Sequence, residues 1–445
     1  MQKNLQLALF VMLLSSVFLL LLIVGPQVRD AIAAGGGKPV VVESGAVDST
    51  TGEAVDTAVT GIGTTAPENI DSQTPEVLDS TGEPTGAAIP KDPYDVTAEI
   101  TEPKVAFQLK YDKYPLTYTY LVVEKAVNVR KGPALTEPKL RVAQKNEKLG
   151  YIETITWPDG VQWYHMTWQQ NGQKLFGFVS ADAVSKRVFQ FDKAYDAVLK
   201  AEQSAAEKPL TYINNYHNLK GSAPLYHGGE TDSTGGKRSQ SAPGYPNLAD
   251  LKEFSYLGDG TLVKVLSSDA QYTRVSLVYD GKEYFVPNKY VATPPAVTAV
   301  KKAVVIDRAN QNEVVFEKID EEWKVVSYTL ATTGTTGEYH QPTPLGFFYG
   351  IEKRERFYYY KDGTTSIQGY APYAVRFAGG AYMHGVPVNY KFDANGGRVD
   401  PGKVEYSSTM GTVPLSHKCV RNYTSHAKFV YDWYTPGEVV VIVIE

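Results

Sequence analysis

From Tyr118 onward, short apolar runs alternate with turn residues, a pattern that predicts a mainly β fold. Between Tyr118 and Arg187 the strand candidates are Val122-Val123, Val127–Val129, Tyr151-Ile152, Trp163–Met166 and Phe176–Val179. Between Leu219 and Thr293 a weaker echo follows, in which Asp280–Val286 parallels Asn171–Val179. These patterns predict two small β domains, at 117–190 and 219–293.

Two segments have helical spacing instead, 193–207 and 426–434. Residues 301–445 are otherwise β-rich, with a hairpin over 303–316 and a last apolar strand at Val439–Ile444. We therefore expect a third domain over 301–445.

Near its start the chain has an apolar run, Leu5–Val24, which follows Lys3. Its roughly 20 residues would span about 30 Å as a helix, enough to cross the hydrocarbon core of a membrane. Ala31–Ala33 resembles a signal cleavage site but lies far from the run. Residues 1–34 are therefore either an uncleaved membrane anchor, which this spacing favours, or a cleaved signal peptide. Both alternatives place the rest of the chain outside the cytoplasm, in the periplasm or cell envelope.

The segment that follows is polar and poor in aromatic residues. No aromatic residue occurs from Gly35 to Asp92, and Lys38 and Lys91 are its only basic residues among many acidic ones. Such a composition buries too little apolar surface to offset the entropy of the chain. It predicts a disordered acidic linker over 35–100.

Length and charge narrow the classes of protein further. A chain of 445 residues is too long for one core and predicts two to four domains. The formal net charge is −5 and no long Lys/Arg run occurs, so the sequence argues against a nucleic-acid partner. It also lacks a close ligand pair such as Cys-x-x-Cys, and we expect no metal.

Cys419 is the only cysteine, so no disulfide can form within the chain. A lone thiol in an exported protein persists most readily when it is buried or functional. Cys419 lies in the stretch Ser416–Asn422, and His384 lies upstream in Met383-His384-Gly385. An imidazole can lower the pKa of a thiol and produce a nucleophilic thiolate. On residue types alone, an inert buried cysteine is the alternative.

Part of the first β domain resembles a known family. Val127–Pro133 resembles the opening signature of bacterial SH3 domains, and Gly177–Val179 resembles their closing strand. The resemblance implies an SH3-like domain at 117–190 and, more weakly, a second, degenerate one at 219–293. Such domains would bind the cell wall.

Residues 301–445 resemble the L,D-transpeptidase catalytic domain through four landmarks in the family's order. These are the hairpin Val304–Gln311, the turn Thr343–Phe348, the histidine motif Met383–Gly385 and the nucleophile segment Ser416–Asn422. The resemblance implies a mainly β, multidomain protein in which small SH3-like barrels precede a β-rich catalytic domain with one or two short helices.

This resemblance also implies roles for single residues. Cys419 would be the acylated nucleophile and His384 the base, with its ring oriented by the carbonyl of Gly385 or of a neighbouring residue. Backbone N–H groups near Lys418 and Cys419 would hold the oxyanion of the tetrahedral intermediate.

The neighbours of Cys419 would shape the substrate pocket. His417, Arg421 and Asn422 are expected there, and Arg421 would pair either with a substrate carboxylate or within an internal salt bridge. Ser416 is expected to be a structural hydrogen-bonding residue.

Two departures from the family pattern bear on activity. Lys418 replaces the glycine that normally precedes the nucleophile, so a backbone conformation open to glycine would be less accessible. The spacing from His384 to Cys419 is long, which implies an inserted loop over 391–410.

The implied reaction is acyl transfer between peptidoglycan stem peptides, without a cofactor. Cys419 would attack the amide before the terminal D-alanine of a tetrapeptide stem, and an amine of another stem would resolve the thioester. The alternatives are water as acceptor (an L,D-carboxypeptidase), a protein amine (wall attachment), or a non-catalytic peptidoglycan-binding scaffold. The N-terminal segment would add contact with a membrane.

Overall fold

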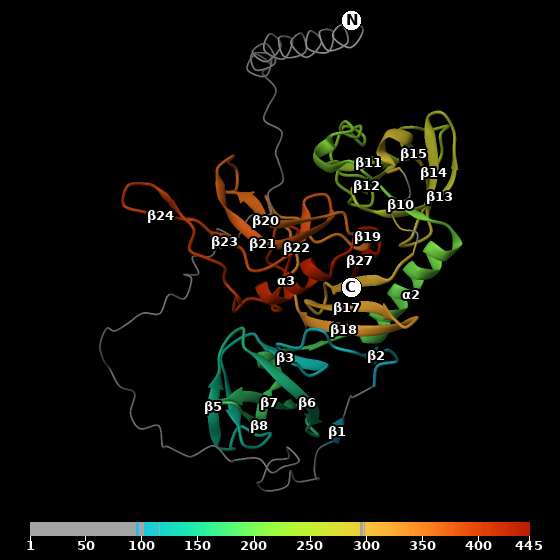
Figure 1. Cartoon of the computed structure of the whole chain (residues 1–445). Coiled ribbons are helices and arrows are strands. Elements are labelled where there is room, and N and C mark those ends of the chain that lie inside the picture. Colours follow the sequence, from blue (N-terminus) through green and yellow to red (C-terminus); the bar gives the residue numbers. More distant parts are fainter. Residues whose placement is uncertain (1–94, 98–101, 115, 294–296, 298) are drawn as a thin grey trace, which may run out of the picture. The chain divides into compact units, whose positions relative to one another are not determined.

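The computed structural model describes residues 95–97, 102–114, 116–293, 297 and 299–445. It confirms the predicted mainly β fold: across these residues six sheets are accompanied by two α-helices, α2 (Phe191–Glu207) and α3 (Thr424–Trp433) (Figure 1). Both helices lie where helical spacing predicts them. The expected anchor or signal at 1–34 and most of the expected linker at 35–100 lie outside the described residues. Within the part described, no helix is long and apolar enough to cross a membrane.

The first sheet has eight strands, and its main path runs β5-β4-β8-β7-β6-β3-β9, with β1 paired to β6. Its strands are β1 (Asp95–Thr97), β3 (Thr119–Val123), β4 (Val127–Arg130), β5 (Lys139–Ala143), β6 (Lys148–Thr156), β7 (Gln162–Gln170), β8 (Gln173–Ser180) and β9 (Val184–Val188). Asn171 and Gly172, with φ of 51° and 78°, make the tight turn between β7 and β8. Both positive values suit the two-residue hairpin that Asn-Gly predicts. The end of the expected linker, Asp95–Thr97, is thus part of a sheet.

A second group of strands, here called the middle unit, covers residues 210–291. A four-stranded sheet runs β10-β13-β14-β15, and β11 pairs with β12. The strands are β10 (Leu210–Tyr212), β11 (Ser241–Gly244), β12 (Ser255–Gly258), β13 (Leu262–Ser268), β14 (Tyr272–Leu277) and β15 (Glu283–Pro287). Its core includes Ile213, Val263 and Val275. The sheet begins at Leu210, before the expected start at 219.

The region after 301 forms two packed sheets, and residues 106–107 add an edge strand, β2, to one of them. One runs β19-β27-β16-β17-β18-β2, the other β20-β21-β22-β26 with β23 paired to β21, and β24 and β25 form a separate hairpin. Their strands are β2 (Ala106–Phe107), β16 (Lys302–Asp307), β17 (Asn312–Ile319), β18 (Glu322–Leu330), β19 (Gly346–Tyr349), β20 (Glu352–Tyr360), β21 (Ile367–Ala378), β22 (Ala381–His384), β23 (Val388–Asn389), β24 (Lys391–Phe392), β25 (Arg398–Val399), β26 (Val420–Arg421) and β27 (Val439–Ile444). The predicted hairpin and the last strand are confirmed as β16–β17 and β27.

The six-stranded sheet is buried on both faces, which explains its continuous apolar runs. On one face Val304 and Ile306 pack with Phe377 and Val420 of the second sheet. On the other, Val305 joins a core with Val198 of α2. Each fully buried Val or Ile stabilises the fold by about 1.5–3 kcal/mol, so this double burial fixes the sheet that supports the second one. The edge strand β2 lies in the chain between β1 and β3 of the first sheet, and the sequence gives no signal for it.

Candidate active site

A single strand pairing brings the two predicted catalytic residues together. His384 ends β22, and Cys419 immediately precedes β26. The two strands run parallel, with Met383 opposite Val420 and His384 opposite Arg421. Strand β22 is fully buried and Val420 of β26 packs in the same core as Met383, so the hydrophobic core fixes their register.

The imidazole of His384 is held in one orientation by the next residue. Its Nδ1 lies 2.6 Å from the carbonyl oxygen of Gly385, and a carbonyl can only accept a hydrogen bond. Nδ1 therefore carries the proton and Nε2 is left as the proton acceptor. Burial lowers the pKa of His384 to about 4; the bond to Gly385 opposes this shift and the charge of Arg421 adds to it.

The thiol of Cys419 is buried as well. Its Sγ donates to the carbonyl of Gly380 at 3.7 Å, and the side chain is 1% exposed. Burial raises the pKa of Cys419 to about 11, against the opposing effects of the Tyr382 backbone N–H and of the Arg421 and Lys418 charges. In the described residues no hydrogen bond joins this thiol to His384. At neutral pH the thiol and the imidazole are therefore both uncharged.

Two side chains, Ser416 and Thr343, hold the backbone of the nucleophile segment. Ser416 Oγ donates to the Cys419 carbonyl at 2.5 Å. Thr343 Oγ1 donates to the Lys418 carbonyl at 2.8 Å and accepts the Gly334 N–H at 2.8 Å. A Cβ at Gly334 would overlap the backbone of Gln341 and Lys418, so only glycine fits there. The Thr343 motif therefore acts directly on the backbone that carries Cys419.

Lys418 adopts ordinary backbone geometry. Among the non-glycine residues described, ten have positive φ, and Lys418 is not one of them. A side chain therefore causes no backbone strain at the position where the family pattern has glycine.

His417 and Asn422 point away from Cys419 toward other partners. His417 Nε2 lies 3.0 Å from an oxygen of Asp362, and its ring stacks on His340 with centroids 3.7 Å apart. Burial lowers the pKa of His417 to about 4. Asn422 Nδ2 donates to the buried carboxyl of Glu313 at 3.2 Å, and its N–H donates to the carbonyl of His384.

The other two predicted site residues, Arg421 and Gly385, contribute to the site through their backbone positions. Arg421 pairs with His384 through β26 and with Thr332 through backbone hydrogen bonds, and its charge reaches both His384 and Cys419. A Cβ at Gly385 would crowd Thr424 Oγ1 at 2.7 Å, so close packing favours glycine here.

Sequence reasoning missed the roles of Thr343, Asp362, Tyr382 and Glu313. Thr343 lies within the turn motif Thr343–Phe348, and Glu313 could have been noticed as an acidic residue directly before the apolar run Val314–Phe316. Asp362 and Tyr382 carry no comparable signal. The expected inserted loop contains the β24–β25 hairpin, and its residue Glu405 accepts the Ser425 N–H at the start of α3.

No group of three or more His, Cys, Asp or Glu side chains in the described ranges is arranged to hold a metal ion.

The region that contains this site matches a known protein family. Residues 301–442 match the YkuD family, the L,D-transpeptidase catalytic domain. The match contains His384, Cys419 and Thr343, and ends within β27. It covers the C-terminal part of the chain alone, and no curated protein matches the chain.

Solved structures show weaker likeness. A fused Zn-dependent amidase/peptidase/peptidoglycan-binding domain-containing protein from Clostridium acetobutylicum is 20% identical over 34% of this chain and 54% of its own, with a TM-score of 0.23. This chain therefore spans about half of that relative. An L,D-transpeptidase from Mycobacterium smegmatis is 17% identical over 41% and 82%, with a TM-score of 0.26. L,D-transpeptidase 3 from Mycobacterium tuberculosis is 15% identical over 41% and 98%, with a TM-score of 0.25. Likeness at this level decides nothing about the activity of this chain.

Proposed function

We propose that this protein is a peptidoglycan L,D-transpeptidase with Cys419 as nucleophile and His384 as base. The observation that carries the proposal is the hydrogen bond from His384 Nδ1 to Gly385, on a strand paired with the one that follows Cys419. It leaves Nε2 free to accept a proton. The family match over 301–442 supports the same assignment.

In the proposed reaction the thiol proton moves to His384 Nε2 as Sγ attacks the amide carbonyl before the terminal D-alanine. The C–N bond then breaks, and the imidazolium protonates the departing amine. An amine of a second stem attacks the resulting thioester, passes its proton to His384 and releases Sγ. Because the thiol and imidazole are both neutral at rest, proton transfer accompanies attack and no stable thiolate precedes it.

The burial of Cys419 requires movement before a stem peptide can react. The thiol packs in a cluster with Phe357, Tyr359, Ala371, Ala374 and Tyr382, from strands β20, β21 and β22. In this proposal the β20–β21 hairpin shifts when substrate enters, and the low-dielectric surroundings then strengthen the backbone donors to the oxyanion.

Mass spectrometry of the protein with disaccharide-tetrapeptides tests this proposal. Wild-type protein should give cross-linked dimers and free D-alanine, and Cys419→Ala should give neither. Release of D-alanine without dimers would identify water as the acceptor, an L,D-carboxypeptidase. No turnover by wild-type protein, with peptidoglycan binding retained, would favour a non-catalytic scaffold.

We further propose that the SH3-like regions at 117–190 and 219–293 bind the wall, that the protein is exported, and that residues 5–24 anchor it. Linked binding modules raise the effective concentration of the enzyme at its polymer. A sedimentation assay with isolated sacculi measures the binding. Equal sedimentation of the whole protein and of a protein of similar size without wall affinity would refute it.

A further inference from the structure

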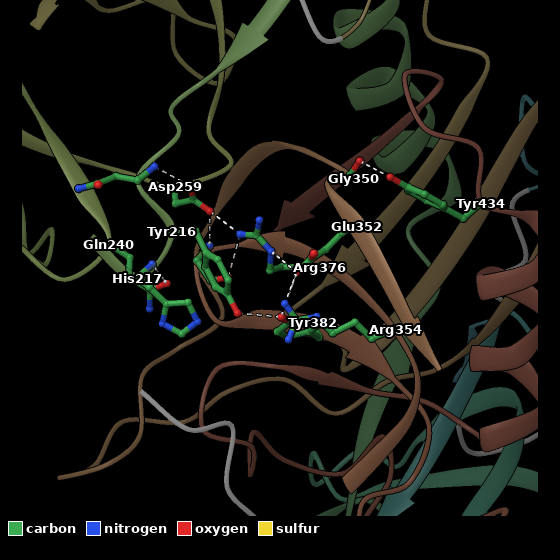
Figure 2. Close-up of polar contacts among 12 residues, drawn as sticks. Tyr216, His217, Gln240, Asp259, Gly350, Glu352, Arg354, Arg376, Tyr382 and Tyr434 are labelled. Carbon is green, nitrogen blue, oxygen red and sulfur yellow. Dashed lines mark hydrogen bonds and ion pairs between the residues drawn. The ribbon is translucent and has the colours of Figure 1, made fainter. Parts of the chain in front are cut away.

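A buried ion pair links the middle unit to the strand that leads to the active site. Asp259, in the turn between β12 and β13, accepts a hydrogen bond from Arg376 Nη1 on β21 at 2.7 Å (Figure 2). The side chains are 0% and 7% exposed. Burial raises the pKa of Asp259, and the charge of Arg376 opposes that shift. A carboxylate this deeply buried needs its partners, so the contact holds both parts in one arrangement.

Both members of this pair also hold the turn between β21 and β22. The Gly379 N–H donates to Asp259 Oδ2 at 3.3 Å, and Arg376 Nη1 donates to the Gly379 carbonyl at 3.4 Å. The next carbonyl, that of Gly380, accepts the Cys419 thiol. Two hydrogen-bonded steps therefore separate a carboxylate of the middle unit from the proposed nucleophile.

A tyrosine of the middle unit makes a second connection. The guanidinium of Arg376 lies 3.8 Å above the ring of Tyr216, and Tyr216 Oη lies 3.0 Å from Tyr382 Oη (Figure 2). Tyr382 belongs to the same buried cluster as Cys419, and its backbone N–H lowers the pKa of that thiol. The middle unit thus contacts Gly379, which precedes the carbonyl that accepts the thiol, and the side chain of Tyr382, whose backbone N–H lies near the sulfur.

The close fit beside this pair shows that the contact is specific. Gly260 has φ of 87°, and a Cβ there would overlap the carbonyl of Phe377 on β21. The Tyr349 N–H of β19 donates to the Gly260 carbonyl at 2.9 Å. Only glycine allows the backbone of the middle unit to approach the second sheet this closely.

We propose that the middle unit is part of the active site, with Asp259 and Tyr216 as positioning residues for Cys419. The proposal rests on the proposed function for its effect on acyl transfer, but its effect on the thiol is independent of it. Through the turn at 379–380 and the Tyr382 N–H, the two residues set how the thiol is held. This role goes beyond binding the wall.

The test compares three variants of the full chain. Asp259→Asn keeps the size of the side chain and removes its charge. Tyr216→Phe removes one hydroxyl and spares the buried ion pair. Glu202→Gln is the matched control, because Glu202 also joins the region after 301 from outside, through Lys318 at 2.7 Å and Trp323 at 2.8 Å, without touching the 379–380 turn. Thermal melting establishes that each variant is folded.

The rate of Cys419 alkylation by iodoacetamide is then measured against pH, together with the rate of acylation by a carbapenem. Asp259→Asn loosens the 379–380 turn, so the Gly380 carbonyl no longer holds the proton of the Cys419 thiol firmly. The alkylation midpoint should therefore fall by at least about half a pH unit. Acylation should slow roughly tenfold or more, because a small displacement of the reacting groups lowers the reaction rate strongly. Tyr216→Phe should also slow acylation, but it should raise the alkylation midpoint, because it loosens the residue whose N–H lowers the pKa of the thiol. Glu202→Gln should change neither quantity.

Unchanged alkylation and acylation in Asp259→Asn would overturn the proposal, as would equal shifts in Glu202→Gln. If Asp259→Asn does not fold, Tyr216→Phe decides by the same criteria. If the alkylation midpoint shifts while wild-type protein turns over no muropeptide, the positioning role stands and the proposed function fails.

Discussion

His384 Nδ1 lies 2.6 Å from the carbonyl oxygen of Gly385, so the residue next in the chain fixes the tautomer of the proposed base. No second side chain is needed as an orienting partner. The acidic residue that orients histidine in many hydrolases has its counterpart here in a backbone group. Substitution of Gly385 would disturb this arrangement only through its Cβ, which would crowd Thr424.

His384→Ala should slow acylation of Cys419 by roughly 10²–10⁴-fold, the usual effect of losing a general base. The direct measurement is the rate of thioester formation with a tetrapeptide stem under single-turnover conditions. His426→Ala, which removes an equally buried histidine bonded to Ser327, is the control for general damage to the core. Equal rates in wild-type protein and His384→Ala would remove His384 from the mechanism.

A carbapenem should form one covalent adduct, on Cys419. The strained lactam carbonyl offers the thiol the same kind of electrophile as the stem peptide. Intact-protein mass spectra before and after incubation give the number of adducts, and Cys419→Ala should show none. An adduct at any other residue would contradict the assignment of the nucleophile.

Lys418→Gly should bring no gain in activity, although it restores the residue of the family pattern. Lys418 has no backbone strain to relieve, and its charge lowers the pKa of Cys419. The alkylation midpoint of Cys419 should therefore rise slightly in Lys418→Gly and stay unchanged in Lys418→Arg. A clear increase in turnover for the glycine variant would show that the side chain obstructs the site.

Glu313→Gln should change the pH dependence of stability. Burial raises the pKa of Glu313 from 4.5 to about 8, with Asn422 and His426 as its neighbours. Between these values the unfolded chain releases a proton that the folded chain retains, so stability is fully present below pH 4.5 and is lost as pH rises toward 8. The glutamine variant lacks this loss.

Urea unfolding at pH 5 and pH 8 measures the effect. The free energy of unfolding of wild-type protein should fall relative to that of Glu313→Gln, by about 1.4 kcal/mol for each pH unit between the unfolded and the folded pKa. Glu202, whose pKa is lowered by Lys318 and Trp323 despite partial burial, provides the control variant Glu202→Gln, which should not reproduce the change. Parallel pH curves for wild-type protein and Glu313→Gln would show that Glu313 is already ionised in the fold.

The sequence predicted the parts of the site that lie in short motifs. The segments around His384 and Cys419, the hairpin at 303–316 and the last strand were all found from local patterns. The charge state of the site could not be predicted in this way. An imidazole was expected to lower the pKa of the thiol, whereas burial raises it to about 11, and burial depends on the whole fold.

Contacts between distant segments were also beyond the sequence. Gly258-Asp259-Gly260 has the composition of an exposed turn, yet Asp259 is buried against Arg376, 117 positions away. Nothing local to either residue distinguishes a solvent-exposed charge from one that is paired across the protein. The strand β2 was missed for the same reason, since two residues carry no periodicity.

The strand β27, at residues 439–444, lies between β19 and β16 inside the six-stranded sheet. It forms parallel pairs with one neighbour and antiparallel pairs with the other, and its residues reach the cores on both faces. A protease that trimmed these six residues would therefore split the sheet in two instead of shortening an edge. It would abolish the support beneath His384 and Cys419 without cutting near either of them. Under the proposed function, proteolysis at this remote strand would therefore abolish activity while leaving both proposed catalytic residues in the chain.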